Sequence, residues 1–386
     1  MLPPAPAAHP NLSTREVGLM LQHTMRLCLI TLVIGLTGCA AQGGANPPLE
    51  RLDLPPGFDI EVFAEVPGAR SLAVADGGRK VYVGTRERDL YAVLDGNRDG
   101  VADGVLHVAT GLKVPNGLAA TDGRLFVAEQ HRIIRFEPDG KVDIVVPEGI
   151  LPDFRHHGWR YAAVGPDGKL YVAIGAPCNI CEISGFEGTI IRMNPDGHNL
   201  EIFARGVRNA VGFDWHPVTG EMFFTDNGGD NLGDLIPPDE LNRAMEPELH
   251  FGYPFVYGDG GPYPQLAGRE PPADMTAPAL AFEAHAAALG IHFYRGAMFP
   301  DDFRNDAFVA QHGSWNRTEP IGYRIMRVHF DDDGLPTGKE VFVNGWLGRD
   351  GRPWGRVVDV AELPDGSLLV SDDFAGLVYR ITYADH

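Results

Sequence analysis

Residues 123–140 read GRLFVAEQHRIIRFEPDG, and this stretch decides the fold class. A glycine that ends one turn leads into an alternating apolar run, a short polar break follows, and a second apolar run closes at a Pro-Asp-Gly turn. Alternation with a period of two is typical of a strand that buries one face. Two such runs joined by a short polar break predict an antiparallel hairpin.

Five further segments repeat this order of turn, strand, break and strand. They are RKVYVG with LYAV at 79–93, GKLYVAIGAP with GTIIRMNPDG at 168–197, GEMFFTDNGG at 220–229, DAFVAQHGSWNR with GYRIMRVHFDDDG at 306–334, and GSLLVSDDFAGLVYRITY at 366–383. One such sheet cannot bury both of its faces alone, whereas radial stacking of the copies as blades buries them. The sequence therefore predicts an all-β, six-bladed β-propeller. A two-domain β-sandwich is the structural alternative, which the lack of a proline- or serine-rich internal linker disfavours.

Two segments near the chain ends favour closure of the ring. Residues 57–63, GFDIEVF, alternate without a nearby hairpin partner, and the last repeat ends in VYRITY at 378–383. Pairing of these strands would remove two exposed sheet edges at once, so we expect the first strand to complete the last blade. The long stretch at 237–265, PPDELNRAMEPELHFGYPFVYGDGGPYPQ, is expected to form a functional loop over one mouth of the channel.

The first 39 residues resemble an export signal rather than part of the fold. Met25-Arg26 precedes an apolar run over 27–36 that is too short for a permanent membrane span, and the run ends in Leu-Thr-Gly-Cys. This ending resembles the bacterial lipoprotein box. We therefore expect an exported, periplasmic protein whose lipidated Cys39 is its only membrane contact; an ordinary cleaved signal with a chance cysteine is the alternative. The expected division is a signal peptide with lipoprotein box over 1–39, a flexible tether over 40–53 and the propeller over 54–386.

The net charge of −20 disfavours nucleic acid as a partner, because a polyanion would be repelled from most faces. Cys178 and Cys181 form the one close cysteine pair after the export signal. In an exported protein we interpret them as a small structural disulfide. A redox-active C-x-x-C motif is the alternative, but no βαβ pattern accompanies it.

Four segments carry residues suited to chemistry. A possible base next to cations is found in RHHGWR at 155–160, and an Arg-Asn pair that could bind a carboxylate or carbonyl oxygen is found in GVRNAVGF at 206–213. The acidic and amide side chains of TDNGGDN at 225–231 suit a hard cation. The aromatic and arginine side chains of HGSWNR at 312–317 and RPWGR at 352–356 could sandwich a flat anion. Each also has an ordinary structural interpretation as a turn, a cap or a wedge between blades. Residues 95–103 begin like a calcium loop, but Leu106 stands where its glutamate belongs, so we interpret them as a turn with a possible structural calcium.

Taken together and in order, these segments resemble the PQQ-dependent glucose and sorbosone dehydrogenase family from about Leu54 to Tyr383, closer to the sorbosone branch. The resemblance implies a catalytic histidine four residues before an arginine, which selects His156, with His157 as the second candidate. It also implies cofactor binding by a set of arginines and an amide: Arg160, Arg208, Asn209, Arg317 and Arg356.

The resemblance further implies calcium held by main-chain carbonyl groups at Gly228 and Gly229, with an acidic partner nearby. The candidate acids are Asp234, Asp239 and Glu240. Three departures from the glucose dehydrogenase pattern make glucose itself a poor substrate. Val211 replaces an amide, Val358 replaces an arginine, and Asn316 and Arg317 lie nearest to an absent lysine.

The expected function is oxidation of an aldose or sorbosone-like sugar by hydride transfer to PQQ, with calcium as a Lewis acid, a histidine base and a quinone or cytochrome as electron acceptor. One alternative is a calcium-dependent sugar lactonase. Its site would draw on Glu129, Asn116, Asn209 and Asp226. The other alternative is a propeller that binds without catalysis, since a fold alone does not define a function.

Overall fold

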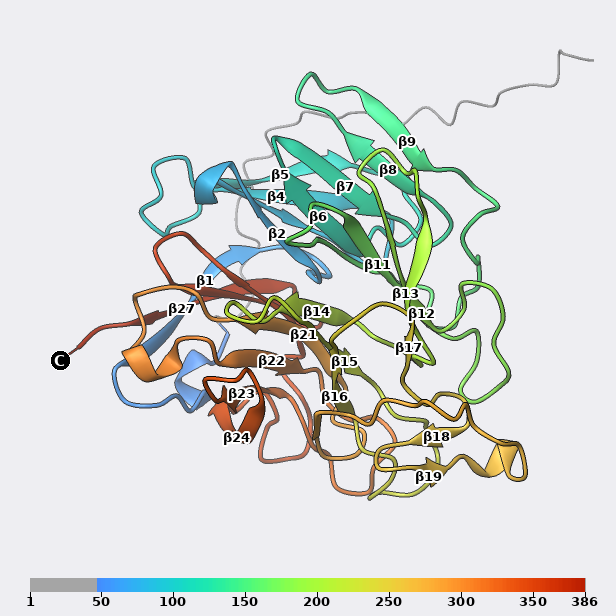
Figure 1. The fold of residues 1–386 in the computed structure, drawn as a ribbon. Helices are drawn as coiled ribbons and strands as arrows, with labels where there is room; N and C mark the ends of the chain where they lie inside the picture. The colour runs from blue at the N-terminus through green and yellow to red at the C-terminus, as the bar shows by residue number, and fades with distance from the viewer. Residues whose placement is uncertain (1–46, 386) are drawn as a thin grey trace, which may run out of the picture.

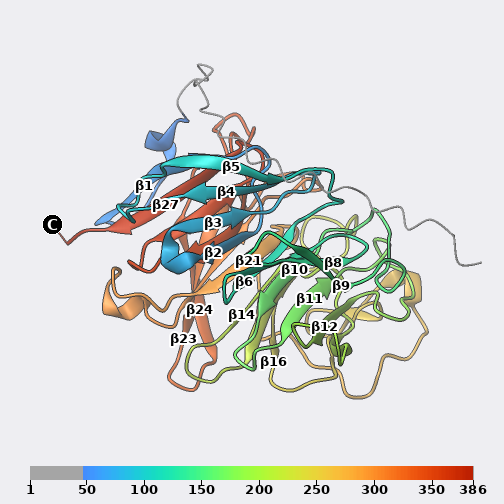
Figure 2. The same ribbon diagram turned by 90° about the horizontal axis from the view of Figure 1, so that it is seen from above.

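The computed structural model describes residues 47–385, which form six sheets around a common axis (Figures 1 and 2). This confirms the predicted all-β, six-bladed propeller. The predicted signal peptide, the lipidated Cys39 and residues 40–46 of the tether lie outside the described residues. No helix in the described part of the chain is long and apolar enough to cross a membrane.

Each blade has four strands, which run outward from the axis in chain order. The first blade consists of β2 (Leu72–Ala75), β3 (Lys80–Val83), β4 (Leu90–Leu94) and β5 (Gly104–Ala109). The second blade consists of β6 (Gly117–Thr121), β7 (Arg124–Ala128), β8 (Ile133–Phe136) and β9 (Val142–Val146). The third blade consists of β10 (Tyr161–Val164), β11 (Leu170–Ile174), β12 (Thr189–Met193) and β13 (Glu201–Arg205), and β17 (Leu249–His250) pairs in parallel with β13.

The last three blades follow the same order. They consist of β14 (Gly212–Trp215), β15 (Met222–Asp226), β16 (Glu240–Ala244) and β20 (Leu280–Ala281); β21 (Ala288–Phe293), β22 (Ala307–Gln311), β23 (Arg324–Phe330) and β24 (Pro336–Val343); and β25 (Val357–Glu362), β26 (Leu368–Asp372), β27 (Leu377–Tyr383) and β1 (Phe58–Glu65). Four short 3-10 turns join these elements: η1 (Leu49–Arg51), η2 (Asp76–Gly78), η3 (Pro264–Leu266) and η4 (Asp301–Phe303).

The apolar alternation of each strand supplies the cores between neighbouring blades, as β11 illustrates. Leu170, Val172 and Ile174 on one face of β11 pack with side chains of the second blade. Tyr171 and Ala173 on the other face pack with side chains of the fourth blade. Both faces of a central strand are therefore buried, although successive side chains still point in opposite directions.

The ring closes as predicted. β1 pairs antiparallel with β27, with Ile60 opposite Ile381, and the two strands lie side by side in Figure 1. The innermost strand of each blade contacts that of the next, and β25 contacts β2. The strand from the start of the domain thus completes the last blade, which leaves no open edge between the first and last blades.

The predicted boundary between tether and propeller at residue 53 is wrong, because residues 47–53 already pack against the propeller. Leu49 and Leu52 pack against the core of the last two blades. Asp53 exchanges two main-chain hydrogen bonds with Asn344, at 2.9 and 3.1 Å. Burial of two leucine side chains is sufficient reason for this segment to dock.

The long stretch at 237–265, which was expected to cover one mouth of the channel, lies mainly at the edge of the molecule. Within 249–270 the chain forms β17, the hairpin of β18 (Val256–Tyr257) and β19 (Gly261–Pro262), and η3, at the edge of the molecule in Figure 1. Tyr253 and Tyr263 pack with Ile180 and Ile183. The Tyr263 hydroxyl accepts a hydrogen bond from the Gly229 amide at 3.1 Å, so this insertion supports the glycine turn from behind.

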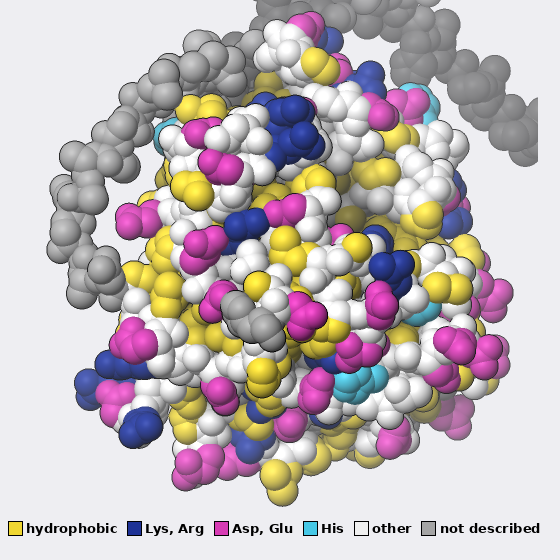
Figure 3. All heavy atoms as spheres, turned by 90° about the vertical axis from the view of Figure 1, so that its left-hand side faces the viewer, with side chains coloured by type: hydrophobic (Ala, Val, Ile, Leu, Met, Phe, Trp, Pro, Cys, Tyr) yellow, Lys and Arg dark blue, Asp and Glu magenta, His cyan; other side chains and the backbone are white. Residues whose placement is uncertain are grey.

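The acidic excess is spread over the surface. On the face in Figure 3, Asp and Glu side chains are scattered with Lys and Arg side chains between them. Many described carboxylates belong to ion pairs, for example Arg295 with Asp214 and Arg380 with Asp365. The net charge therefore does not mark one acidic docking face.

Candidate active site

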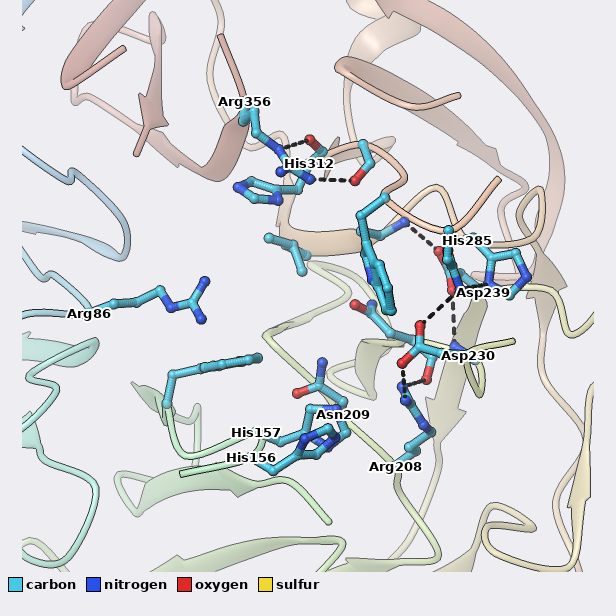
Figure 4. Close-up of a pocket in the computed structure, with 18 of the residues that line it drawn as sticks. Arg86, His156, His157, Arg208, Asn209, Asp230, Asp239, His285, His312 and Arg356 are labelled. Atoms are coloured by element: carbon cyan, nitrogen blue, oxygen red, sulfur yellow. Dashed lines mark hydrogen bonds and ion pairs between the residues drawn. The ribbon is translucent and has the colours of Figure 1, made fainter. Parts of the chain in front are cut away.

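One pocket of about 580 Å³ opens at a single rim of the propeller. Its walls are loops that precede the first strand or follow the second strand of a blade, and antiparallel pairing brings those loops to the same end of the sheet. All four segments singled out in the sequence contribute, including His156, Arg208, Gly228 and Arg356 (Figure 4). The sequence-based grouping of these segments is therefore confirmed.

The lining is strongly basic for so acidic a chain. Five arginines, four histidines and only two aspartates face the pocket. Sequence reasoning missed Arg70, Arg86 and His285, which come from the first and fifth blades and lie far from the recognised motifs. In Figure 4 Arg86 extends into the pocket from the side opposite Arg208 and Asp230.

Buried carboxylates at strand ends fix two of the cationic loops. Asp226, the last residue of β15, accepts the main-chain N–H groups of Arg208 at 2.7 Å and Asn209 at 2.5 Å. Asp372, the last residue of β26, accepts the N–H of Arg356 at 2.9 Å. Burial, aided by the charge of Glu240, raises the pKa of Asp226 to about 8. These carboxylates hold the loops and leave the loop side chains free to face the pocket.

Four hydrogen bonds to Asn179, Asn227 and Asp230, here called the Arg208 hub, hold the guanidinium group of Arg208, whose side chain is 3% exposed. It donates to the main-chain oxygens of Asn179 and Asn227, both at 2.9 Å, and to Asn179 Oδ1 and Asp230 Oδ2, both at 2.8 Å. Asn179 lies between Cys178 and Cys181, which form a disulfide with Cα atoms 6.1 Å apart. The predicted structural disulfide is thus confirmed, and it braces the site.

The Arg356 side chain makes fewer hydrogen bonds than that of Arg208. Its Nε and Nη2 atoms donate to the main-chain oxygens of His312 at 3.1 Å and Gly313 at 2.6 Å. Since a guanidinium group carries five N–H donors, three remain for a ligand. Its carbon centre lies 5.5 Å from the ring centroid of Tyr323, which limits its orientation.

Of the two adjacent histidines, His157 has the more defined ring. Its Nδ1 atom lies 3.0 Å from the main-chain oxygen of Ala176, and a carbonyl group can only accept, so Nδ1 carries the proton and Nε2 has a free lone pair. Burial first, then the charge of Arg208, holds the pKa of His157 well below its usual value. The His156 ring lies 4.1 Å away, between centroids, and makes no hydrogen bond within the described structure.

A second imidazole faces the pocket from the fifth blade. His312 Nε2 lies 2.8 Å from Asp373 Oδ1, and Asp373 Oδ2 accepts from Arg70 at 2.5 Å. Burial lowers the pKa of His312 to about 4, although Asp373 opposes that shift. Arg70 and His312 together hold the pKa of Asp373 well below its usual range, against the effect of burial. Asp373 thus accepts hydrogen bonds from both His312 and Arg70, and its negative charge neutralises that of Arg70.

Two predicted cofactor-binding arginines lie outside the pocket. Arg160 is fully buried and donates to the main-chain oxygens of His157, Gln130 and Pro152, so it braces the histidine loop from behind. Burial lowers its pKa to about 10. Arg317 donates to the main-chain oxygens of Glu319 and Ala284 and does not line the pocket. Neither residue therefore faces a ligand in the pocket, contrary to what the resemblance implied.

The carboxylates predicted as calcium ligands do not converge. Asp234 lies outside the pocket and accepts the Thr318 amide at 3.1 Å, and Glu240 faces a separate small cavity. Asp239 does face the pocket, but its oxygens accept the amides of Gly228, Ala287 and Ala288. In the described residues no group of three or more His, Cys, Asp or Glu side chains could hold a metal.

The glycine turn remains the candidate calcium position. Gly228 lines the pocket beside the side chains of Asn209 and Asn227, whereas Gly229 is turned toward Tyr263. A Cβ at Gly228 would lie 2.7 Å from the Pro238 oxygen, so the close approach requires glycine. Carbonyl and amide oxygens are ligands that calcium accepts.

Two positions that depart from the glucose dehydrogenase pattern, Val211 and Val358, belong to one apolar cluster. Val211, Leu289 and Val358 pack together, with Trp159 against them. All three aliphatic side chains are buried. Leu289 and Trp159 line the pocket, whereas Val211 and Val358 do not, so the two valines have a packing role here.

The residues proposed for a lactonase site are not gathered. Only Asn209 of that set lines the pocket. Glu129 accepts the Lys113 amide, Asn116 accepts from Arg70 and donates to the Arg160 oxygen, and Asp226 anchors the Arg208 loop. At 95–103 the Asp95 oxygens accept the amides of Asp99 and Gly100, as in an ordinary turn.

Comparison with known proteins agrees with this architecture. A family model described as TrAA12-like matches residues 269–382. A protein of *Borreliella burgdorferi* described as uncharacterized is 34% identical over 354 residues, which cover 86% of this chain and 91% of that protein.

Three solved structures share this fold. The holo PQQ domain of a *Coprinopsis cinerea* pyranose dehydrogenase has a TM-score of 0.72 at 18% identity and covers 86% of this chain and 97% of its own. The calcium structure of a *Trichoderma reesei* family AA12 enzyme has a TM-score of 0.73 at 18% identity, with the same coverage. The apo soluble aldose sugar dehydrogenase of *Escherichia coli* has a TM-score of 0.63 at 16% identity and covers 85% and 100%. The likeness to these structures shows the shared fold, and the chain belongs to one family with the Borreliella protein.

Proposed function

We propose that this protein is a PQQ-dependent sugar dehydrogenase that oxidises a hydroxyl group of an aldose or sorbosone-like sugar. The observation that carries the proposal is one rim pocket in which a histidine with a free lone pair faces several cations. The name of the *Coprinopsis* neighbour, a pyranose dehydrogenase with a PQQ domain, supports the same reaction class.

The residues present fit a flat molecule with three carboxylates. Arg356 retains three N–H donors and Arg208 retains one. Trp315 lies at the mouth with 69% of its surface exposed, so its indole face is available for stacking. These groups would hold PQQ by ion pairs and stacking.

When bound, PQQ supplies a quinone that accepts a hydride from the hydroxyl-bearing carbon and later returns two electrons to a quinone or cytochrome acceptor. His157 Nε2 would take the hydroxyl proton, because its own Nδ1–H is held by Ala176. The low pKa of His157 keeps the imidazole neutral, and therefore able to accept a proton, at neutral pH.

For calcium we propose ligation by oxygens rather than by acidic side chains. The Gly228 main-chain oxygen and the amide oxygens of Asn209 and Asn227 would be the protein ligands, since these residues line the pocket. The ion would act as a Lewis acid toward the carbonyl group that accepts hydride.

Reconstitution tests this function. Purified protein with PQQ and calcium should retain the quinone absorbance and reduce an artificial dye when given aldoses or sorbosone-like sugars. His157→Gln should lower turnover at least about 100-fold, the usual scale for a general base, while PQQ remains bound. His156→Gln tests the residue that the spacing in the sequence selects: if His156 is the base, this variant should lose the activity and His157→Gln should retain it. Lactone hydrolysis without PQQ would favour the lactonase, and neither activity would favour a binding propeller.

We also propose that the protein is exported and anchored in a bacterial membrane through Cys39. The disulfide at Cys178 and Cys181 supports an oxidising compartment. Expression in a bacterial host with a labelled fatty acid should label the wild type and not Cys39→Ser. An unlabelled but exported wild type would instead indicate an ordinary cleaved signal.

A further inference from the structure

A groove of about 430 Å³ adjoins the main pocket on the side of the first blade. The two cavities share four walls: Arg70, Arg86, Arg155 and Trp159. The rest of the groove is formed by loops of the first three blades and by Asp373. The groove and the pocket are therefore neighbours, separated by no more than these four side chains.

The groove contains two cations without a protein partner. Neither Arg86 nor Arg155 makes a side-chain hydrogen bond or an ion pair with any described residue, whereas Arg70 is neutralised by Asp373. The Arg86 guanidinium carbon lies 4.2 Å from the ring centroid of Trp159, which orients its donors. Burial and the charge of Arg70 lower the pKa of Arg86 to about 10, so it remains charged at neutral pH.

The charge balance of the groove favours an anion. Its two carboxylates are Asp373, which Arg70 and His312 already engage, and Glu87, which is exposed and forms no ion pair with Arg86 or Arg155. Both arginines are exposed to solvent, and because no protein carboxylate pairs with them, they give this groove a local positive charge in a chain with 52 acidic and 32 basic residues.

The position of the groove indicates what part of a ligand it would meet. Arg155 directly precedes His156 and His157, and Arg86 lies across the pocket from Arg208 (Figure 4). The groove thus adjoins the histidine loop, whereas Arg356, which retains three donors, lines the main pocket and not the groove.

We propose that this groove is an oxyanion subsite and that the substrate is an acidic sugar, which bears a carboxylate or a phosphate group. This inference rests on the proposed function. The oxyanion would bind Arg86 and Arg155, while the hydroxyl group to be oxidised lies near His157. Arginine suits either group, because its planar donors match both carboxylate and phosphate oxygens.

Direct binding is the first test. Calorimetric titration of PQQ-loaded protein with glucuronate, glucose 6-phosphate and glucose should give measurable binding for one or both acids and at least tenfold weaker binding for glucose. The two acidic probes distinguish a carboxylate site from a phosphate site. Binding of the acids should weaken as salt is raised, since exposed ion pairs are screened.

Substitutions locate the site. Arg155→Gln and Arg86→Gln should each weaken binding of the acid at least tenfold, and should lower kcat/KM for acidic relative to neutral sugars mainly through KM. Arg349→Gln is the matched control, because Arg349 is exposed and lies outside both cavities.

Three results would overturn the inference: equal binding of glucose and the acids, an unchanged preference in both variants, or loss of PQQ affinity with the preference intact, which would make these arginines cofactor ligands. Failure of the proposed function has a different signature. Acidic sugars would then still bind through Arg86 and Arg155, but no sugar would reduce the dye.

Discussion

Replacement of Asn179 by alanine should loosen the Arg208 side of the pocket without removing any group that faces a ligand. The Asn179 side chain accepts from Arg208 Nη2 and from the Asp230 amide, both at 2.8 Å, and donates to the Asp230 oxygen at 3.0 Å. The main-chain bond from Arg208 Nε to the Asn179 oxygen does not depend on the side chain. The variant thus tests the hub itself.

The expected magnitude follows from the kinds of bond lost. A hydrogen bond to a charged group contributes about 1.5–3 kcal/mol and a neutral one about 0.5–1.5 kcal/mol. Because Arg208 is nearly inaccessible to water, solvent cannot replace the lost acceptor. Allowing for non-additivity within one network, we expect a loss of about 3 kcal/mol in the free energy of unfolding.

Chemical denaturation and a PQQ titration monitored by absorbance provide the assay. Asn179→Ala should lower the denaturation midpoint and weaken PQQ binding together. Cys178→Ala with Cys181→Ala should produce a smaller loss, about 2 kcal/mol for so short a loop, and a reductant should then have no further effect. If Asn179→Ala leaves both stability and PQQ affinity at wild-type values, the hub does not position Arg208.

Three further outcomes follow from buried polar groups. Arg160→Met should lower the free energy of unfolding by roughly 2–4 kcal/mol through the lost carbonyl bonds, while dye reduction per folded molecule stays within about threefold; selective loss of PQQ would restore Arg160 as a ligand. Burial raises the pKa of Asp226 to about 8 and of Glu240 to about 7, so between about pH 7 and 8, above the range in which the lowered pKa values of His157 and His312 act in the opposite direction, the folded state binds more protons than the unfolded chain. The free energy of unfolding of the apoprotein should therefore rise as the pH falls through that window, and a flat profile in denaturation would contradict these shifts. Asp372→Asn should weaken PQQ binding through the displaced Arg356 loop, and an unchanged titration would show that the strand-end anchor is dispensable.

Period-two alternation and repeated glycine turns were sufficient to predict the blades and the closure by β1, because both express how strands bury their faces. The site was only partly predictable. Arg86 carries no local signal, since its role depends on Trp159 from another blade. Arg160 was mistaken for a ligand because sequence proximity to His156 does not determine side-chain direction, and here the side chain turns inward.

The same blade geometry explains where positive charge is placed around the pocket. In the second, fourth and sixth blades a carboxylate at the end of the second strand accepts the amide of a basic residue before the first strand: Lys113, Arg208 and Arg356, respectively. Arg208 and Arg356 face the pocket, but Lys113 pairs outside it with Asp153. The repeat therefore supplies no free cation from the second blade. Arg86 and Arg155, which belong to neighbouring loops and not to this repeat, provide the charge on that side, and a role in recognising the substrate accounts for their presence there better than a role in holding the loops.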